Sequence, residues 1–198
     1  LNLNLEHPVI GLIPGSRRTE VETILPPLLA AANKLHTQNP ALQFVLPKAS
    51  NIDSELLREK LSESPVPIKV TTDNRYVTMQ ACDVVIAASG TVTLELALLE
   101  IPMIIAYKTN ALTFWLGKQL VSLKHLGLPN IIAQQTIVPE LLQDNLTVEK
   151  IVTEVNQLLT DTQHYALTKS HLAKIHQSLE NKVTETSLKQ LILDALQR

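Results

Sequence analysis

The sequence predicts an α/β fold in which a Rossmann-like parallel sheet carries helices on both faces and a helical tail follows it. Two observations predict the sheet. Short apolar segments alternate with segments of helical periodicity over most of the chain, which is the pattern of repeated strand–helix–strand units. The apolar segments are also continuous, as in Asp-Val-Val-Ile-Ala-Ala at 83–88. Strands that are buried on both faces of a parallel sheet have this composition.

The expected strands and helices follow one another in a regular order. We expect strands at residues 8–13, 42–47, 67–71, 83–88 and 102–107. We expect helices at residues 21–38, 51–61, 74–82, 91–100 and 111–123. Pro26 and Pro27 lie within the first of these helices. Because proline removes a backbone donor, they predict a kink or a restart of that helix.

The end of the chain differs from the rest. After about Thr147 the sequence is helical throughout and offers no strand candidate. Apolar residues there form a broken stripe that comprises Leu172, Ile175, Leu179, Leu188, Leu191, Ile192, Ala195 and Leu196. We therefore expect a Rossmann-like domain at 1–150 and a helical tail at 151–198, packed on this domain or on a domain outside this sequence. The chain has no initiator Met, so we expect a fragment.

Composition excludes several classes of function. The net charge of −2 and an aromatic content of 3% argue against a nucleic-acid-binding protein. Cys82 is the only cysteine, which fits a reducing compartment and a small buried core residue. No apolar run approaches the roughly 18–20 residues that span a bilayer. The six histidines show no metal-ligand spacing, so the sequence predicts no metal site.

The first chemically informative loop is Pro-Gly-Ser-Arg-Arg, which follows the first expected strand. Gly15 allows close backbone approach, Ser16 can cap a helix or donate to a phosphate, and Arg17 and Arg18 add two cations. A helix N-terminus already favours an anion, so two arginines there are unfavourable unless an anion binds in the turn. The alternative is an ordinary turn with two solvent-facing arginines. The loop is neither a Walker A nor a GxGxxG motif.

A second loop, Ala-Ser-Gly-Thr-Val-Thr-Leu-Glu, follows the fourth expected strand. Ser89, Gly90 and Thr91 lie where a helix begins, so backbone N–H groups and hydroxyls would face a diphosphate. Glu95 lies about one turn into that helix, where it either complements the helix dipole or accepts hydrogen bonds from a ribose. Ligands of open α/β sheets bind beyond the carboxyl ends of the strands. The two loops together therefore predict one nucleotide site.

A third stretch, Gly-Leu-Pro-Asn-Ile-Ile-Ala followed by Ile-Val-Pro-Glu-Leu-Leu-Gln, is less specific. We expect Asn130 in a loop and Glu140 at a helix start. Turns favour Pro-Asn and helix starts favour Glu, so both residues also have ordinary structural interpretations.

These segments resemble the C-terminal half of the lipid-A-disaccharide synthase family, inverting glycosyltransferases of the GT-B fold. The similar segments are GLIPGSRRTEV, ASGTVTLELALLEIPMIIAYK, LTFWLGKQLV, and LPNIIA with IVPELLQ. They occur in the family's order. The Ser-Gly-Thr-x-Thr-Leu-Glu stretch followed by Ile-Pro-Met is the most specific of them.

The resemblance implies an activity and a donor site. Enzymes of this family transfer 2,3-diacylglucosamine from its UDP donor to 2,3-diacylglucosamine 1-phosphate and release UDP. By resemblance, Arg17 binds phosphate, Glu95 holds the ribose and Asn130 lines the nucleotide pocket. The full set implied to bind the UDP-sugar is Gly15, Ser16, Arg17, Arg18, Ser89, Gly90, Thr91, Glu95 and Asn130. No cofactor and no metal are implied.

The resemblance also implies partners and a location. The catalytic acid or base is expected in an N-terminal half that this sequence does not contain, so the chain alone should be inactive. The remaining expected partners are the UDP-sugar donor and an acylated sugar phosphate acceptor. A cytoplasmic location follows, with peripheral contact at the inner face of the bacterial inner membrane. The segment 109–127 is either an interfacial helix that touches lipid or a helix packed on the sheet.

Two departures from the family pattern keep other functions open. Gln134 and Gln135 stand where members usually carry a charged residue, and Glu100 replaces a common Gly. The alternatives are another GT-B sugar-nucleotide enzyme, such as a UDP-N-acetylglucosamine 2-epimerase, and a non-catalytic nucleotide-binding domain. Such epimerases carry a similar loop of small residues with a Glu, but the segments LTFWLGKQLV and LPNIIA fit the lipid-A-disaccharide synthase pattern better.

Overall fold

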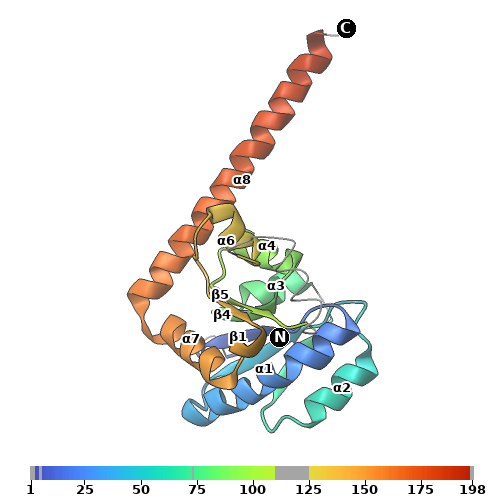
Figure 1. Ribbon diagram of the computed structural model, residues 1–198, viewed down its shortest axis with the longest axis vertical. Helices are drawn as coiled ribbons and strands as arrows, with labels where there is room; N and C mark the ends of the chain where they lie inside the picture. Colours follow the sequence, from blue (N-terminus) through green and yellow to red (C-terminus); the bar gives the residue numbers. More distant parts are fainter. Residues whose placement is uncertain (1–2, 5, 73, 110–124, 197–198) are drawn as a thin grey trace.

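A six-stranded parallel sheet organises the molecule (Figure 1). The computed structural model describes residues 3–4, 6–72, 74–109 and 125–196, with side chains described up to residue 179. The strands lie in the order β3-β2-β1-β4-β5-β6. Their bounds are β1 Val9–Ile13, β2 Gln43–Pro47, β3 Ile68–Thr71, β4 Val84–Ala88, β5 Met103–Tyr107 and β6 Glu140–Leu142.

The order of the strands reverses at β1. This strand pairs with β2 on one side and with β4 on the other, so that Ile10 lies between Phe44 and Val84. From β1 the chain first builds the sheet outward through β2 and β3, and then returns to add β4, β5 and β6. Such a switch point is where loops from adjacent strands diverge and leave room for a ligand.

Helices cover both faces of the sheet. Their bounds are α1 Arg18–Gln38, α2 Ser54–Ser62, α3 Arg75–Gln80, α4 Thr91–Leu98, α6 Leu128–Ala133, α7 Val148–Thr160 and α8 Thr162–Leu196. Alternate residues of β1 point to opposite faces: Ile10 and Leu12 pack in the core with α1, α2 and α7, whereas Val9 and Ile13 pack in the core with α3, α4 and α8. Burial on both faces explains why the central strands β1 and β4 carry no polar side chain.

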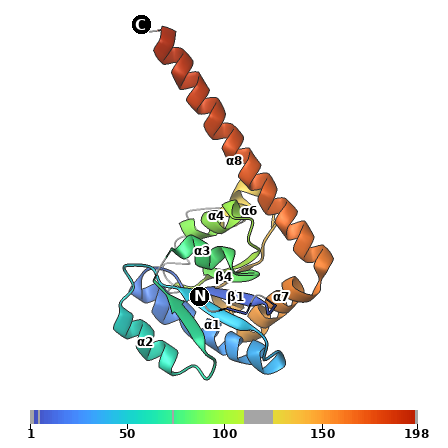
Figure 2. The same ribbon diagram turned by 180° about the vertical axis from the view of Figure 1, so that it is seen from behind.

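The C-terminal helices pack on the sheet domain over part of their length. Helix α7 lies against α1 and buries Ile151 and Val155 in the core that these helices share. The first part of α8 packs on α4 and α6, with Leu172 and Ile175 buried. The rest of α8 extends away from the sheet in both views (Figures 1 and 2). The expected boundary between domain and tail, at 150/151, falls inside α7.

The five predicted strands are confirmed, each to within one residue at its start. Of the predicted helices, those at 21–38, 51–61, 74–82 and 91–100 are confirmed with shifted ends, and the one at 111–123 lies outside the described residues. A restart at Pro26 is wrong, because α1 continues through both prolines. The apolar residues that flank the two prolines are buried, namely Ile24, Leu25, Leu28 and Leu29. Their burial offsets the free-energy cost of a proline inside a helix, about 3 kcal/mol.

Two expectations for the third stretch are also wrong. Asn130 lies in helix α6 and not in a loop, because Pro129 occupies a first-turn position where its missing N–H costs nothing. Glu140 begins strand β6 and not a helix. The backbone of β6 pairs with β5, with Glu140 opposite Ile105, and this tertiary pairing outweighs the local preference of Pro-Glu for a helix start.

Candidate functional site

A cavity of about 320 Å³ lies at the carboxyl ends of the central strands. Its lining includes Ile13 and Ala88, the last residues of β1 and β4, and the loops that follow these two strands. Both predicted loops therefore contribute to one cavity, with Gly15, Ser16 and Arg17 from the first and Ser89, Gly90 and Thr91 from the second. The cavity lies at the switch point of the sheet, where ligands of this fold class bind.

The first loop is organised by a carboxylate of helix α1. Oε2 of Glu20 accepts hydrogen bonds from the backbone N–H groups of Ser16 (2.8 Å) and Arg17 (3.1 Å), and Oε1 accepts one from Nη1 of Arg17 (3.0 Å). Gly15 has a φ of 113°, and a Cβ there would lie 2.3 Å from Oε2 of Glu20. The turn therefore requires glycine, and its Ser16 and Arg17 N–H groups bind the Glu20 carboxylate as their anion.

The second loop presents a helix N-terminus to the cavity. Gly90 is the N-cap of α4, and Thr91 and Val92 of its first turn line the cavity. Their N–H groups have no partner within the helix, so they can donate to an anion. A Cβ added at Gly90 would meet no atom within 4 Å. The glycine is thus not required by packing and leaves open space beside the helix end.

Sequence reasoning missed two cations of the cavity, Lys48 and Arg75. Lys48 follows the last residue of β2, and Arg75 begins α3, which follows β3. The rule that ligands bind beyond the carboxyl ends of parallel strands would have found both residues, had it been applied to the second and third strands. Together with Arg17, they give the cavity lining three cationic side chains and one carboxylate, that of Glu20.

Glu95 does not line this cavity, but it contacts a residue that does. Oε1 of Glu95 accepts a hydrogen bond from Nη2 of Arg75 at 2.9 Å. Arg75 also donates to the hydroxyl of Tyr76 at 3.1 Å, and its guanidinium carbon lies 5.0 Å from the centre of the Tyr76 ring. The pKa of Arg75 is raised, first by the hydrogen bond to Tyr76 and, against some desolvation, by the charge of Glu95. The guanidinium is therefore a permanent cation.

Arg18 and Asn130 lie away from the cavity lining. Arg18 donates to Glu22 at 2.8 Å and lies 3.8 Å from Asp53, the N-cap residue of α2. Asn130 is fully buried, and its amide joins α6 to the chain that leads into β6. Asn130 accepts hydrogen bonds from the N–H groups of Ile137 and Val138 and donates to the carbonyl of Val138 and to Oε1 of Glu140.

Glu140 connects this buried cluster to the second loop. Its carboxylate accepts hydrogen bonds from the backbone N–H groups of Leu126 (2.9 Å) and Gly127 (3.0 Å), at the start of α6. The carbonyl of Leu126 accepts a hydrogen bond from the hydroxyl of Ser89 at 3.3 Å. Glu140 therefore acts on the shape of the cavity through Ser89 and not through direct contact.

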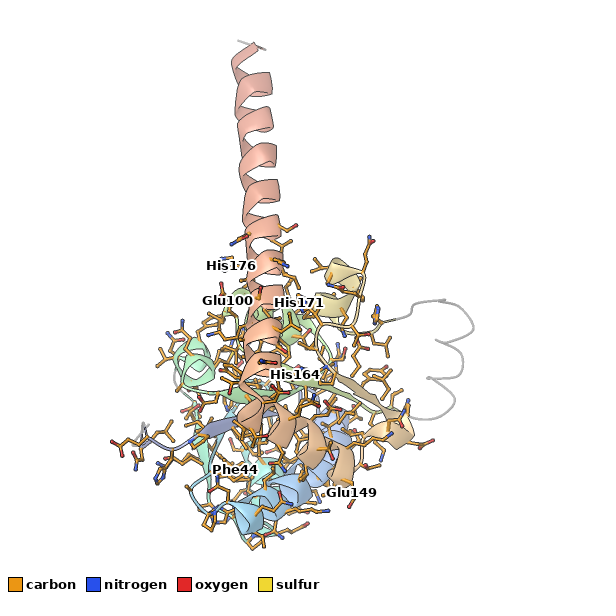
Figure 3. All side chains as sticks on the ribbon, turned by 90° about the vertical axis from the view of Figure 1, so that its left-hand side faces the viewer. Phe44, Glu100, Glu149, His164, His171 and His176 are labelled. Carbon is orange, nitrogen blue, oxygen red and sulfur yellow. The ribbon has the colours of Figure 1, made fainter. Side chains whose placement is uncertain are left out.

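Other titratable residues have structural surroundings. Burial, and secondarily the charge of Asp83, raises the pKa of the Cys82 thiol to about 12. His176 lies 3.6 Å from Glu100 on the face where α8 packs (Figure 3). Within the described ranges, no group of three His, Cys, Asp or Glu side chains is placed to hold a metal ion. In the same part of the chain, no helix is long and apolar enough to cross a bilayer.

Solved structures share the fold at low sequence identity. A UDP-GlcNAc 2-epimerase from Neisseria meningitidis, bound to UDP-GlcNAc, matches with a TM-score of 0.61 at 15% identity, over 94% of this chain and 46% of that chain. A spinosyn rhamnosyltransferase complexed with thymidine diphosphate matches with a TM-score of 0.58 at 17% identity, over 89% of this chain and 43% of that chain. These similarities show the Rossmann-like α/β fold.

Sequence comparison identifies the family. The chain is 40% identical over 196 residues to the lipid-A-disaccharide synthase of Trichlorobacter lovleyi. This alignment covers 99% of this chain and 51% of that protein. It is 41% identical over 160 residues to the lipid-A-disaccharide synthase of Coxiella burnetii, over 81% of this chain and 42% of that protein. The chain thus spans about half the length of these relatives. Since the family model for lipid-A-disaccharide synthetase matches residues 1–195, the chain belongs to the lipid-A-disaccharide synthetase family.

Proposed function

We propose that this chain is the donor-nucleotide-binding half of a lipid-A-disaccharide synthase. The whole enzyme would transfer 2,3-diacylglucosamine from its UDP donor to 2,3-diacylglucosamine 1-phosphate and release UDP. The observation that carries this proposal is the meeting of two loops at one cavity. The Gly15–Arg17 turn and the N-terminus of α4 line the same space, although they are far apart in the sequence.

The chemistry of the cavity fits a diphosphate. Glu20 already accepts hydrogen bonds from two N–H groups of the first loop, so within the two loops the donors left for a ligand are the remaining N–H groups of the Arg17 side chain and the end of α4. Glycosyl transfer places growing negative charge on the departing UDP. Donors and cations that are fixed around that charge stabilise it more in the transition state than in the ground state.

The nucleotide-bound neighbours support a nucleoside diphosphate as the ligand class. One neighbour is bound to UDP-GlcNAc and another to thymidine diphosphate. The match to relatives of about twice this length supports a division of labour. In our proposal the acceptor sugar phosphate, the catalytic acid or base and the peripheral membrane contact belong to, or require, the N-terminal half. This chain alone would bind the nucleotide without transfer.

Calorimetric titration of UDP into this chain tests the proposal. We expect saturable binding that is stronger for UDP than for ADP. Arg17→Ala should weaken it about tenfold or more, because one charge-assisted contact to phosphate is lost. Arg58→Ala is the matched control, since Arg58 is exposed on α2 and pairs with Glu55 away from the cavity. Absence of UDP binding, or equal binding by the two variants, would contradict the proposal.

A further inference from the structure

We propose that Arg75 is a further ligand-binding residue, which contacts the diphosphate of the nucleotide and at the same time positions Glu95 for the ribose. This inference rests on the proposed function. Arg75 joins two features of the site that are otherwise separate. It lines the cavity that contains the phosphate-binding loops, and it holds the carboxylate of Glu95, which lies outside the lining.

The contacts of Arg75 leave part of its guanidinium available. Both contacts to neighbouring side chains are made by Nη2, which donates to Glu95 and to the hydroxyl of Tyr76. A guanidinium has five N–H groups. The N–H groups on Nε and Nη1 make no hydrogen bond to a described residue. The side chain is 47% exposed at the cavity, so these three donors are accessible to an anion.

The guanidinium is also held in place before any ligand binds. The ring of Tyr76 lies beside it, the Tyr76 hydroxyl accepts one of its hydrogens, and Glu95 accepts another. Asn74 caps the start of α3 by accepting the N–H of Tyr76 at 3.0 Å. A planar donor group fixed in this way loses little conformational freedom when it binds phosphate, which favours a strong contact.

Within the described part of the chain, Glu95 has an acceptor oxygen without a donor, just as Arg75 has donors without an acceptor. Its Oε1 is bonded to Arg75, whereas its Oε2 is buried and has no hydrogen-bond partner among the described residues. A buried carboxylate oxygen without a donor is unfavourable, so such groups in native proteins call for an explanation. The hydroxyls of a ribose are donors of the required kind. Arg75 thus holds one oxygen of Glu95 and leaves the other to receive a ligand hydroxyl.

The pair also has an electrostatic consequence. A lone carboxylate next to the site would repel a diphosphate, and the charge of Arg75 offsets it at a separation of 2.9 Å. Removing Arg75 would therefore act twice on the ligand. It would delete donors to the diphosphate and leave the Glu95 charge uncompensated.

The test is a double-mutant cycle with calorimetric titration of UDP and of uridine. The proteins are the unchanged chain, Arg75→Met, Glu95→Gln and the double variant, with Arg58→Met as the matched control for loss of an exposed, ion-paired arginine. We expect Arg75→Met to weaken UDP binding about tenfold or more, and to weaken uridine binding less. The double variant should lose less than the product of the two single losses, because the residues act as a pair.

Each outcome decides between the proposals. If Arg75→Met binds UDP as tightly as Arg58→Met does, Arg75 is not a ligand-binding residue, and the proposed function stands. If the two single losses multiply, the positioning of Glu95 is refuted. If the unchanged chain binds no UDP, this inference and the proposed function both fail. Arg75→Lys keeps the charge without the planar fork, so intermediate UDP affinity is expected even where Arg75→Met does not fold.

Discussion

Glu20 accepts two hydrogen bonds from Arg17, one from its backbone N–H at 3.1 Å and one from Nη1 at 3.0 Å. A single carboxylate therefore fixes both the backbone at the start of α1 and the direction of a cation at the cavity. Glu20 is the third residue of α1, where an acidic side chain satisfies free N–H groups and complements the helix dipole. Stability of the helix start and organisation of the site are coupled in this pair.

Glu20→Ala should destabilise the protein more than Glu22→Ala does. The loss of its contacts to Ser16 and Arg17 should lower the free energy of unfolding by about 1 kcal/mol. Glu22→Ala is the control, because Glu22 makes an exposed pair with Arg18 that is worth less than about 0.5 kcal/mol. Urea unfolding monitored by circular dichroism measures both values. Equal losses would show that the Glu20 contacts add nothing beyond a surface ion pair.

Gly15→Ala should be destabilising through the backbone. A φ of 113° is unfavourable for any residue with a Cβ, and the added atom would also collide with Glu20. We expect a loss of about 1–3 kcal/mol in the free energy of unfolding, measured in the same urea experiment. A variant as stable as the unchanged chain would mean that the turn relaxes to another conformation.

Gly90→Ser should separate folding from binding. Ser is a favourable N-cap residue, and the position has open space around it, so the free energy of unfolding should stay within about 0.5 kcal/mol. The new side chain would occupy the space through which a diphosphate approaches the end of α4. UDP affinity should fall about tenfold or more. Unchanged affinity in a stable variant would place the diphosphate elsewhere.

Asn130→Ala should reveal a structural role. The substitution would leave the buried N–H groups of Ile137 and Val138 without an acceptor. We expect a loss of about 2–4 kcal/mol in the free energy of unfolding. Asn33→Ala is a suitable control, because Asn33 is exposed on α1. If Asn130→Ala were as stable as the control and only UDP binding weakened, direct contact with the nucleotide would be the better interpretation.

Cys82 should make stability depend on pH in the alkaline range. Its pKa is about 12 in the folded chain and 9.0 ordinarily, so the native state retains a proton that the unfolded state loses. The stabilisation is complete below pH 9 and is lost as the pH rises toward 12. Cys82→Ala should therefore show a smaller decline in the free energy of unfolding across this window. Tyr165, whose pKa is raised first by burial and then by Asp83, is present in both proteins, so its contribution cancels. Identical declines would show that the thiol is not protected from ionisation.

The sheet could be predicted because its strands are buried on both faces. Continuous apolar runs such as 83–88 are unusual outside such strands, and the observed strand Val84–Ala88 follows the run closely. Strand β6 could not be predicted in the same way. It has three residues, and its conformation depends on pairing with β5. Local preference alone favours a helix start at Pro139 and Glu140.

The candidate site was partly predictable for a related reason. The loop after β1 stands out in the sequence through a glycine and two adjacent arginines, and the loop after β4 through three small residues. Lys48 and Arg75 do not stand out, because a single cation in a loop or at a helix start is ordinarily solvated surface. Only the parallel alignment of strand ends brings them to the same cavity. The pairing of Arg75 with Glu95, 20 positions apart, likewise depends on how α3 and α4 lie over the sheet.

The position of β1 between β2 and β4 has a consequence for how the site forms. The backbone N–H of Val9 donates a hydrogen bond to the side-chain carboxylate of Asp83, 74 positions along the chain, and the two loops of the cavity meet only when β1 and β4 are paired. Contacts over such separations form late and slow the folding of parallel sheets. The binding site is therefore a property of the finished sheet, absent from any shorter folding unit. A nucleotide bound there would stabilise the whole chain against unfolding and proteolysis, in proportion to the logarithm of its concentration.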